Sequence, residues 1–205
     1  MQNINLKNRF KFFCQTLKKS SFGTHYLRFS ESNKEVISLY PLTFNSQNYE
    51  HIFRLKKWRQ RNKKFFSSKN NITYSSTNKY YSSYLNSKKP RLIFYIKYKK
   101  IFVGHFELTN LSNNNKDLEI KYILRGTKKC KGKMSEAIYL TSKFLIINFK
   151  FKNLFIKVEK NNLRAINFYK RINYIFYKNL NKILIFRFKN LKNKKKIEFR
   201  KILIK

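Results

Sequence analysis

The chain has 205 residues, 42% of them hydrophobic and 18% aromatic, which is enough to bury the core of one domain with short extensions. Forty-eight lysines and arginines against nine acidic residues give a net charge of +39, which predicts a polyanionic partner, nucleic acid first and an anionic membrane surface second. No apolar run reaches the ~18 residues of a transmembrane helix, and the isolated Cys14 and Cys130 argue against a disulfide framework or a zinc site.

Residues 1–35 are predicted to form a basic N-terminal arm. The first 30 residues contain no acidic residue and mix lysine, arginine and serine with aromatic residues. This composition fits a mitochondrial or plastid targeting segment. It fits equally a basic arm that stays attached and binds RNA.

The next part of the chain predicts one strand and two helices. Residues 36–42 alternate between apolar and polar and form the first strand. A helix is expected over 45–60, because a side chain suited to N-capping precedes apolar residues at helical spacing. The polar segment 61–78 predicts a loop with a short helix, and a second helix over 78–85 ends before Pro90.

Three strand patterns follow and predict an antiparallel meander. They cover 92–98, 100–109 and 117–124, with a short turn between the first two and a polar loop between the last two. Helical spacing of apolar residues then predicts a helix over 135–149. A further strand is expected over 154–159.

The end of the chain predicts a helix, two strands and a basic tail. The helix covers 163–172, and the strands cover 174–177 and 182–188. Residues 191–205 are strongly basic and predict a solvated tail that adds to the affinity for a polyanion.

The loop 125–134 is the most informative segment for chemistry. It carries two glycines and follows a predicted strand, and it opens onto the predicted helix at Ser135. The free backbone N–H groups and the positive dipole end of such a helix bind phosphate. Lys129, Lys131 and Lys133 add positive charge to the loop.

Specific residues around this loop match a known pattern. The loop Lys129–Met134 has the sequence Lys-Cys-Lys-Gly-Lys-Met, and Ser-Glu-Ala follows it at 135–137. The segment 158–174 then combines Asn162 with an Ala-Ile pair and Tyr169. With the order strand, loop, helix, strand and helix, these residues resemble the GNAT superfamily of N-acetyltransferases, whose loop has Gln or Arg, two residues, Gly, one residue, and Gly or Ala.

Upstream segments extend the resemblance to about 150 residues. Leu39–Leu42 and Trp58–Gln60 resemble the first strand and the "WRN" element of the branch that contains the ribosomal-protein N-terminal and sugar-nucleotide amine acetyltransferases, and Ile101–Gly104 resembles a family strand. Two departures are Lys129 at the first loop position and the pair Asn173–Tyr174 in place of Gly-Phe.

The resemblance implies a fold, a cofactor and a reaction. The fold is α/β with a mixed sheet (α+β), the GNAT acyl-CoA N-acyltransferase fold, over residues 36–190, with the basic extensions 1–35 and 191–205. The cofactor is acetyl-coenzyme A, no metal is expected, and the acceptor is a primary amine.

The resemblance also implies cofactor-binding residues. The splayed fourth strand, including Ile123 and Leu124, would bind the pantetheine arm and polarise the thioester carbonyl through its backbone N–H groups. Asn162 would touch the cofactor arm. The loop would hold the pyrophosphate through its six residues Lys129, Cys130, Lys131, Gly132, Lys133 and Met134.

Candidate catalytic residues are Tyr169, Glu107 and Glu119. Tyr169 stands where the family places the phenol that protonates the departing thiolate, and the alternative is a tyrosine that packs the helix on the sheet. Glu107 and Glu119 are the candidates for the base that takes a proton from the amine, and each could instead pair with a lysine. A structural role is expected for His105, and Trp58 could line the acceptor site or pack in the core.

Two functions remain open from the sequence. The first is acetyl-CoA-dependent N-acetyl transfer to a protein N-terminus or an amino sugar. The second is a GNAT-derived structural component of an organellar ribosome, whose basic arms bind rRNA. The scarcity of glycine and the abundance of lysine, asparagine and isoleucine are typical of an AT-rich genome. We therefore expect a mitochondrial or plastid protein, or a cytoplasmic protein of an AT-rich endosymbiont. The base composition of such a genome is also an alternative explanation for the many lysines.

Overall fold

The computed structural model describes residues 6–31, 34–46, 49–65, 71–110, 116–189 and 198–203. The first half of the domain contains α1 (Leu6–Lys19), β1 (His25–Glu31), β2 (Lys34–Pro41), α2 (Tyr49–Arg61), α3 (Tyr74–Leu85), β3 (Arg91–Tyr98) and β4 (Ile101–Asn110). The second half contains β5 (Asp117–Arg125), α4 (Lys133–Phe149), β6 (Asn153–Glu159), α5 (Leu163–Arg171), β7 (Tyr174–Leu180), β8 (Ile183–Phe188) and β9 (Glu198–Leu203). Short 3-10 turns lie at Phe44–Ser46 and Lys63–Phe65.

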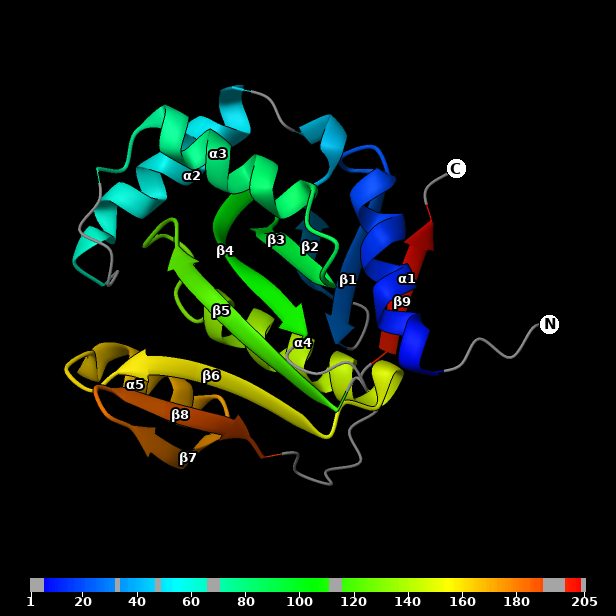
Figure 1. The fold of residues 1–205 in the computed structure, drawn as a ribbon. Helices are drawn as coiled ribbons and strands as arrows, with labels where there is room; N and C mark the ends of the chain where they lie inside the picture. Colours follow the sequence, from blue (N-terminus) through cyan, green and yellow to red (C-terminus); the bar gives the residue numbers. More distant parts are fainter. Residues whose placement is uncertain are drawn as a thin grey trace.

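One nine-stranded sheet organises the described residues, in the order β7-β8-β6-β5-β4-β3-β2-β1-β9. Every neighbouring pair is antiparallel except β5 and β6, which run parallel. The parallel pair follows from the crossover through α4, whereas connections of only two residues join the antiparallel pairs β3–β4 and β7–β8. The mixed sheet confirms the predicted fold class (Figure 1).

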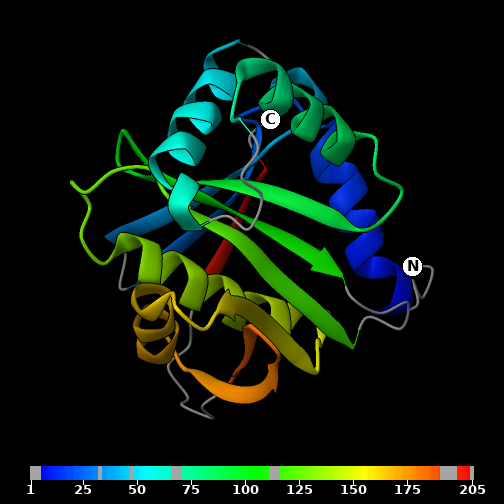
Figure 2. The same cartoon turned by 60° about the vertical axis from the view of Figure 1, so that its left-hand side comes forward.

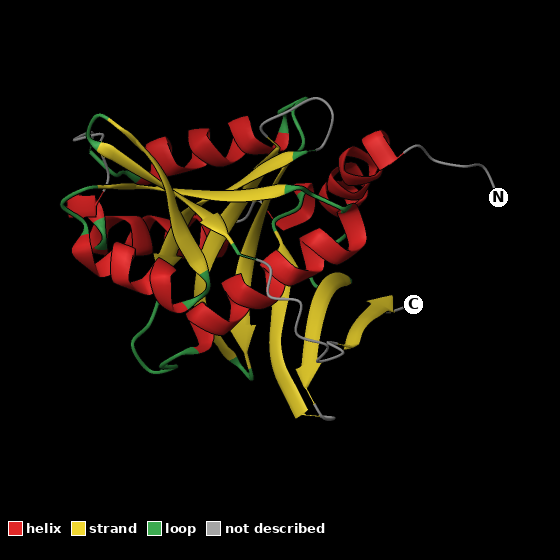
Figure 3. Ribbon diagram, turned by 90° about the horizontal axis from the view of Figure 1, so that it is seen from below, coloured by secondary structure: helices red, strands yellow, loops and turns green. Residues whose placement is uncertain are grey.

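Helices lie on both faces of this sheet and enclose two cores (Figure 3). Along β3, Leu92, Phe94 and Ile96 belong to the core under α1, α4 and α5, and Ile93 and Tyr95 belong to the core under α2 and α3. This alternation is the period of two expected of a strand that is buried on both faces. In Figure 2, α2 and α3 lie across the sheet from α4.

The N-terminal segment departs from the prediction of a basic arm. Residues 6–19 form α1, which buries Phe10, Cys14 and Leu17 in the larger core. These three residues share one face of the helix, and Phe10 meets the ring of Phe149 edge to face at 5.4 Å. Residues 6–31 are therefore part of the packed domain. The many basic residues of α1 masked its apolar face in the sequence pattern.

The C-terminal segment also adds to the sheet. Residues 198–203 of the predicted tail form β9, which pairs antiparallel with β1 through registers such as Leu27↔Lys201. Residues 190–197 lie outside the described part of the chain. The predicted elements between 36 and 188 are present with shifts of up to four residues, which occur at the start of α2 and at the start of α3. There Thr73 and Ser76 form a capping box, so that the helix begins at Tyr74.

Among the described residues, no helix combines the length and apolar character needed to cross a membrane.

Candidate active site

The parallel strands β5 and β6 separate along their length. They pair only over three registers, from Asp117↔Asn153 to Glu119↔Phe155. Beyond this point β5 continues along β4 as far as Arg125, while β6 continues along β8 as far as Glu159. The sheet therefore opens into a wedge whose two edges present strand backbone groups that can bind an inserted ligand. Figure 1 shows β5 and β6 diverging from their common start.

A bulge interrupts β5 in the middle of this wedge. The register passes from Glu107↔Lys121 to His105↔Leu124, so β5 carries one extra residue. Tyr122 accordingly has a φ of +50°, a left-handed conformation that costs on the order of 1–3 kcal/mol for a bulky residue. A bulge at this position turns the strand backbone toward the wedge, as a site for a thioester carbonyl requires.

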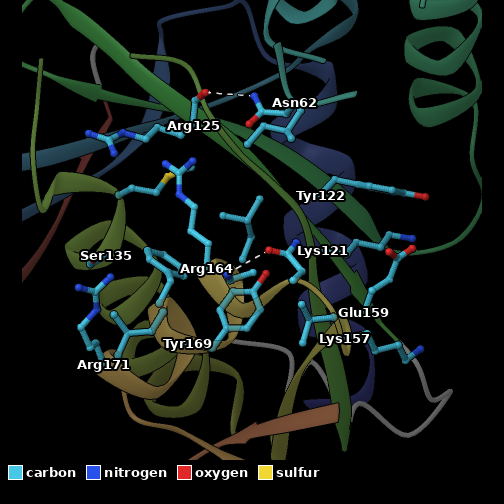
Figure 4. Close-up of a pocket in the computed structure, with 18 of the residues that line it drawn as sticks. Asn62, Lys121, Tyr122, Arg125, Ser135, Lys157, Glu159, Arg164, Tyr169 and Arg171 are labelled. Atoms are coloured by element: carbon cyan, nitrogen blue, oxygen red, sulfur yellow. Dashed lines mark hydrogen bonds between the residues drawn. The ribbon is translucent and has the colours of Figure 1, made fainter. Parts of the chain in front are cut away.

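The wedge holds a cavity of about 690 Å³ (Figure 4). Nine of the predicted site residues line it: Glu119, Ile123, Leu124, Cys130, Lys131, Gly132, Met134, Asn162 and Tyr169. The other three, Glu107, Lys129 and Lys133, are not among the lining residues. The sequence pattern thus located the cleft, and the structure separates the residues that reach it from those that do not.

The start of α4 forms one end of the cavity. Gly132 is the N-cap residue, has a φ of +82° and offers no side chain to the first turn of the helix. The backbone N–H groups of that turn thus lack a side-chain cap, and with the helix dipole they form an anion site. Ser135, in the first turn, lines the cavity. The geometry fits a pyrophosphate.

Two of the predicted loop lysines are directed elsewhere. The Nζ atom of Lys133 lies 2.8 Å from the Glu136 carboxylate and 4.6 Å from the ring centre of Tyr98. Lys129 is exposed, and its backbone N–H donates to the Thr127 hydroxyl at 3.2 Å. Neither side chain is thus part of the cleft wall, because the helix register turns one away and the loop turn exposes the other.

Three arginines supply positive charge that the sequence pattern did not identify. Arg125, Arg164 and Arg171 line the cavity, and Figure 4 shows them on the side where Ser135 lies. Arg125 is held in place because its guanidinium donates to the carbonyls of Thr127 at 2.8 Å and Lys128 at 3.1 Å. Arg164 and Arg171 are seven positions apart on α5, which places both on one side of the helix.

Asn162 and Tyr169 come from the helix that closes the cleft. The Asn162 Oδ1 atom accepts from the Ala165 N–H at 3.1 Å and caps α5. Tyr169 is 8% exposed, and Figure 4 shows its hydroxyl directed into the cavity. Burial raises the pKa of Tyr169 above its usual range, so the phenol stays protonated and can serve as a proton donor.

Glu119 lies at the narrow end of the wedge. Glu119 belongs to the last register at which β5 and β6 pair, and its carboxylate pairs with Lys157 Nζ, two residues further along β6, at 3.1 Å. Its side chain is 10% exposed and lines the cavity. Glu159, which the sequence pattern missed, lines the cavity from the other strand, at the end of β6.

Glu107 is placed in a structural network instead of the cleft. Its buried carboxylate accepts from Arg91 at 2.8 and 3.1 Å, from Tyr80 at 2.7 Å and from Thr109 at 2.8 Å, and it pairs with Lys121 at 3.2 Å. Burial raises the pKa of this carboxyl, but Arg91 and Lys121 outweigh burial and hold it below the usual range. A fully bonded carboxylate of low pKa is a poor base, so the prediction for Glu107 is corrected to a structural role.

His105 and Trp58 pack in the interior. The Trp58 ring stacks on His105 at 6.1 Å and lies against Gly126, where a Cβ atom would collide with it. Trp58 therefore belongs to the core under α2 and does not line the cleft. His105 is 1% exposed, and burial lowers its pKa to about 3.

The comparisons with known proteins agree with this geometry. The model of the acetyltransferase (GNAT) domain family matches residues 38–174, about two thirds of the chain. No curated protein matches the chain significantly in sequence.

Several solved structures share the fold. The Campylobacter jejuni N-acetyltransferase PseH, also solved in complex with acetyl-coenzyme A, is 17% identical with a TM-score of 0.57 over 76% of this chain and 99% of that chain. RimL, a ribosomal L7/L12 alpha-N-protein acetyltransferase, is 14% identical with a TM-score of 0.60 over 80% and 96% of the two chains. A mutant of the Vibrio cholerae spermidine N-acetyltransferase SpeG is 12% identical with a TM-score of 0.58 over 74% and 92%.

The splayed strands, the open start of α4 and the arginines around it suit acetyl-coenzyme A as the cofactor, the group that PseH binds. The chain belongs to the GNAT family of N-acetyltransferases.

Proposed function

We propose that the protein transfers an acetyl group from acetyl-CoA to a primary amine on a neutral or anionic acceptor, either a protein N-terminus or a nucleotide-linked amino sugar. The observation that carries this proposal is the wedge between β5 and β6, which ends on the uncapped first turn of α4. Acetyl-CoA supplies the activated acyl group when bound. The remaining chemistry belongs to side chains and backbone of this chain.

Each part of the wedge has a distinct role in this proposal. The N–H groups at the start of α4, with Arg125, Arg164 and Arg171, hold the phosphates. The turned backbone of β5 at Tyr122 binds the thioester carbonyl and stabilises the negative charge that develops on its oxygen. Tyr169 protonates the departing thiolate.

Glu119 is the residue best placed to take the proton of the amine. It lies where the wedge closes, and it lines the cavity, whereas the other candidate base, Glu107, does not. Lys157, at 3.1 Å, holds it in position. An acceptor amine that enters near this end meets the carboxylate before the thioester.

The charges of the cleft select among acceptors. Six cationic side chains of the described residues line it: Lys121, Arg125, Lys131, Lys157, Arg164 and Arg171. Glu119 and Glu159 are the two carboxylates in the same lining. A polycation such as the spermidine of SpeG would be repelled by this excess. A single amine on a neutral or anionic body avoids the repulsion.

The direct test is a transfer assay that measures release of free CoA with three acceptors. These are a peptide with a free acidic N-terminus, a nucleotide-linked amino sugar and spermidine, each at equal concentration. We expect turnover with one of the first two and none above background with spermidine. Turnover with spermidine alone would contradict the assignment of the acceptor.

Tyr169→Phe tests the assigned proton donor in the same assay. We expect kcat to fall on the order of a hundredfold or more, because the variant keeps the ring but lacks the proton. The affinity for acetyl-CoA should stay unchanged. Tyr169→Phe with full kcat would assign the tyrosine to packing instead.

The alternative function, a structural component of an organellar ribosome, is supported by the net charge of the chain. The arms on which it depended contribute, at residues 6–31 and 198–203, a helix and two strands to the folded sheet domain.

A further inference from the structure

One part of the sheet surface is left open by the helices. The core under α2 and α3 takes its buried strand residues from β3, and the partly buried Tyr40 of β2 and Phe102 of β4 pack against it. Among the described residues, this core includes none from β6, β7 or β8. Along β6, Leu154, Ile156 and Val158 enter the core on the α4 side. The alternate residues therefore face away from α4. We call the surface that these residues share with β7 and β8 the β6–β8 face (Figure 1).

An exposed aromatic group stands on the β6–β8 face. Tyr177 is 46% exposed, and its ring centre lies 5.3 Å from that of Phe155 on β6. The guanidinium carbon of Arg187 on β8 lies 4.9 Å from the same ring centre. A register shift between Phe176 and Lys178 sets Tyr177 outside the strand ladder. An aromatic ring fixed by neighbours and open to solvent is a platform on which a nucleobase can stack.

A cationic hollow adjoins this platform. Its volume is about 360 Å³, and it lies at the margin of the sheet, where Ile146 of α4 and Phe188 of β8 form part of its wall. Lys152, Arg187 and Lys189 contribute the positive charge of the wall. No carboxylate is among the described residues that line it. Arg187 belongs to both the hollow and the aromatic stack, so the hollow at the margin of the sheet adjoins the β6–β8 face.

The acidic residues closest to the hollow along β5 and β6 are already paired, and Glu159 lies at the opposite end of β6. Asp117 accepts a hydrogen bond from Asn153 at 2.7 Å, and Glu119 pairs with Lys157 at 3.1 Å. The positive charges of the hollow thus remain available to an anion. In a chain with a net charge of +39, a second copy would be repelled from such a surface.

We propose that the β6–β8 face binds single-stranded nucleic acid. A base stacks on Tyr177 beside Arg187, and the phosphates on either side of it lie against Lys152, Arg187 and Lys189. The stacking platform distinguishes this ligand from an acidic peptide, which would use the charges and leave the ring without a partner. It also distinguishes a single strand from a duplex, whose bases are stacked on one another.

The proposed site is separate from the acetyl-CoA cleft. The hollow lies at the beginning of β6, at Lys152 and Asn153, whereas the cleft lies along its end, at Val158 and Glu159. Seven strand residues span roughly 20 Å. The two ligands can therefore occupy the protein together, and the proposal does not depend on the acceptor of the transfer reaction.

Fluorescence anisotropy with a labelled oligouridylate of about twelve nucleotides tests the platform. Tyr177→Ala should weaken binding about tenfold, the range expected for loss of one stacked base. Tyr177→Phe should restore wild-type affinity, because the ring remains. The matched control Tyr49→Ala removes a tyrosine that is 66% exposed on α2 and should leave affinity unchanged. Equal affinities for Tyr177→Ala and Tyr49→Ala would overturn the proposal.

A second pair of variants tests the phosphate contacts. Lys152→Gln/Lys189→Gln should lower the slope of log K against log salt concentration by about 1.4, because each phosphate contact on a single strand contributes about 0.7. Lys56→Gln/Lys57→Gln on α2 removes the same charge elsewhere and should lower it less.

Two competitors complete the test. Saturating acetyl-CoA should leave oligouridylate binding unchanged, whereas competition would place the oligonucleotide in the catalytic cleft and contradict the separate site. Inorganic polyphosphate that binds as tightly as the oligonucleotide, with no loss in Tyr177→Ala, would reduce the interaction to net charge and also overturn the proposal.

Discussion

Single residues set the geometry of the cleft where they depart from ordinary strand behaviour. Tyr122 holds a left-handed backbone in the middle of β5, and its ring packs edge to face on Tyr80 at 5.9 Å. Tyr80 in turn donates to Glu107, whose carboxylate also binds Arg91. The strained residue is therefore supported by a buried polar network, as expected when a functional site stores strain.

Gly104 permits the close approach of β4 to the end of β5. A Cβ atom there would collide with the Leu124 backbone oxygen and lie 2.7 Å from Met134 Cε. We expect Gly104→Ala to lower the free energy of unfolding by about 3 kcal/mol, the upper end for an overpacked site, because a backbone oxygen cannot move aside. Urea denaturation measures the loss.

Gly132→Ala is the matched control. No atom lies within 4 Å of its added Cβ, and the cost there is the left-handed φ of +82°, about 1 kcal/mol. Equal losses in the two variants would show that the strands do not approach as closely as described.

His105 makes the stability of the protein sensitive to mild acid. Burial lowers its pKa to about 3, and burial with the nearby Arg54 lowers that of His51 to about 4. The unfolded chain binds these protons near pH 6.5 and the folded chain does not, so stability is full above that pH and falls as the pH decreases toward the folded values. Each histidine contributes a slope of about 1.4 kcal/mol per pH unit.

His105→Leu should remove one of these two slopes. The free energy of unfolding between about pH 6 and pH 5 would then change by about 1.4 kcal/mol less than in the wild type. Guanidinium titrations at the two pH values give the difference. An unchanged dependence on pH would contradict the buried, neutral state of His105.

At the scale of elements, the sheet divides into two parts that meet at the parallel pair of β5 and β6. The antiparallel part from β9 to β5 carries α1 to α3, and the smaller part of β6, β8 and β7 carries α5. Helix α4 connects them and begins at the open end of the wedge. The cofactor site thus arises from topology, at the crossover where two neighbouring strands stop pairing.

Helix α1 is an integral element of this arrangement. Phe10 is fully buried and contacts the rings of Phe149 and Phe151, whereas Phe12 on the same helix is 60% exposed. Phe10→Ala should lower the free energy of unfolding by about 3–5 kcal/mol. Phe12→Ala should change it by less than about 0.5 kcal/mol. Similar small effects in both would restore the interpretation of residues 6–19 as a detachable arm.

The elements between 36 and 188 could be predicted from the sequence because their apolar residues recur with the clear spacing of a strand or a helix. Alternation along 92–98 and 100–109 matches β3 and β4 almost residue for residue. The sequence did not predict α1, β1 and β9, although Phe10, Cys14 and Leu17 have helical spacing, because the basic composition favoured an arm. The pairing of β1 with β9 joins Leu27 to Lys201, a contact so distant in sequence that no local pattern indicates it.

The candidate site also contains residues that the sequence could predict and residues that it could not. The loop and Asn162 could be predicted because each belongs to a short segment, 129–137 or 158–174, that resembles the family pattern. The arginines of the cleft could not, because their placement depends on where α5 packs. Glu107 illustrates the opposite case: a strand carboxylate suggests a base, and only the contacts of Arg91 and Tyr80 show that it is already bonded.

At the scale of the whole molecule, a basic chain is folded around an acyl-transfer site. The described helices and strands account for both cores, and the cleft concentrates positive charge where an anionic cofactor binds. The excess positive charge outside the cleft predicts a polyanionic partner, and the β6–β8 face is the site that we propose for it. Localisation in an organelle or an endosymbiont also stays a prediction.

The most direct test of the central claim is calorimetric titration of acetyl-CoA into the wild type, Ser135→Ala and Ser135→Glu at moderate salt. A glutamate in the first turn of α4 favours the helix but repels a pyrophosphate, so the fold should be kept while binding is lost. We predict micromolar affinity for the wild type and Ser135→Ala, and a dissociation constant at least about tenfold higher for Ser135→Glu. Absence of binding by the wild type, or equal binding by all three proteins, would contradict an acetyl-CoA site between β5, β6 and the start of α4.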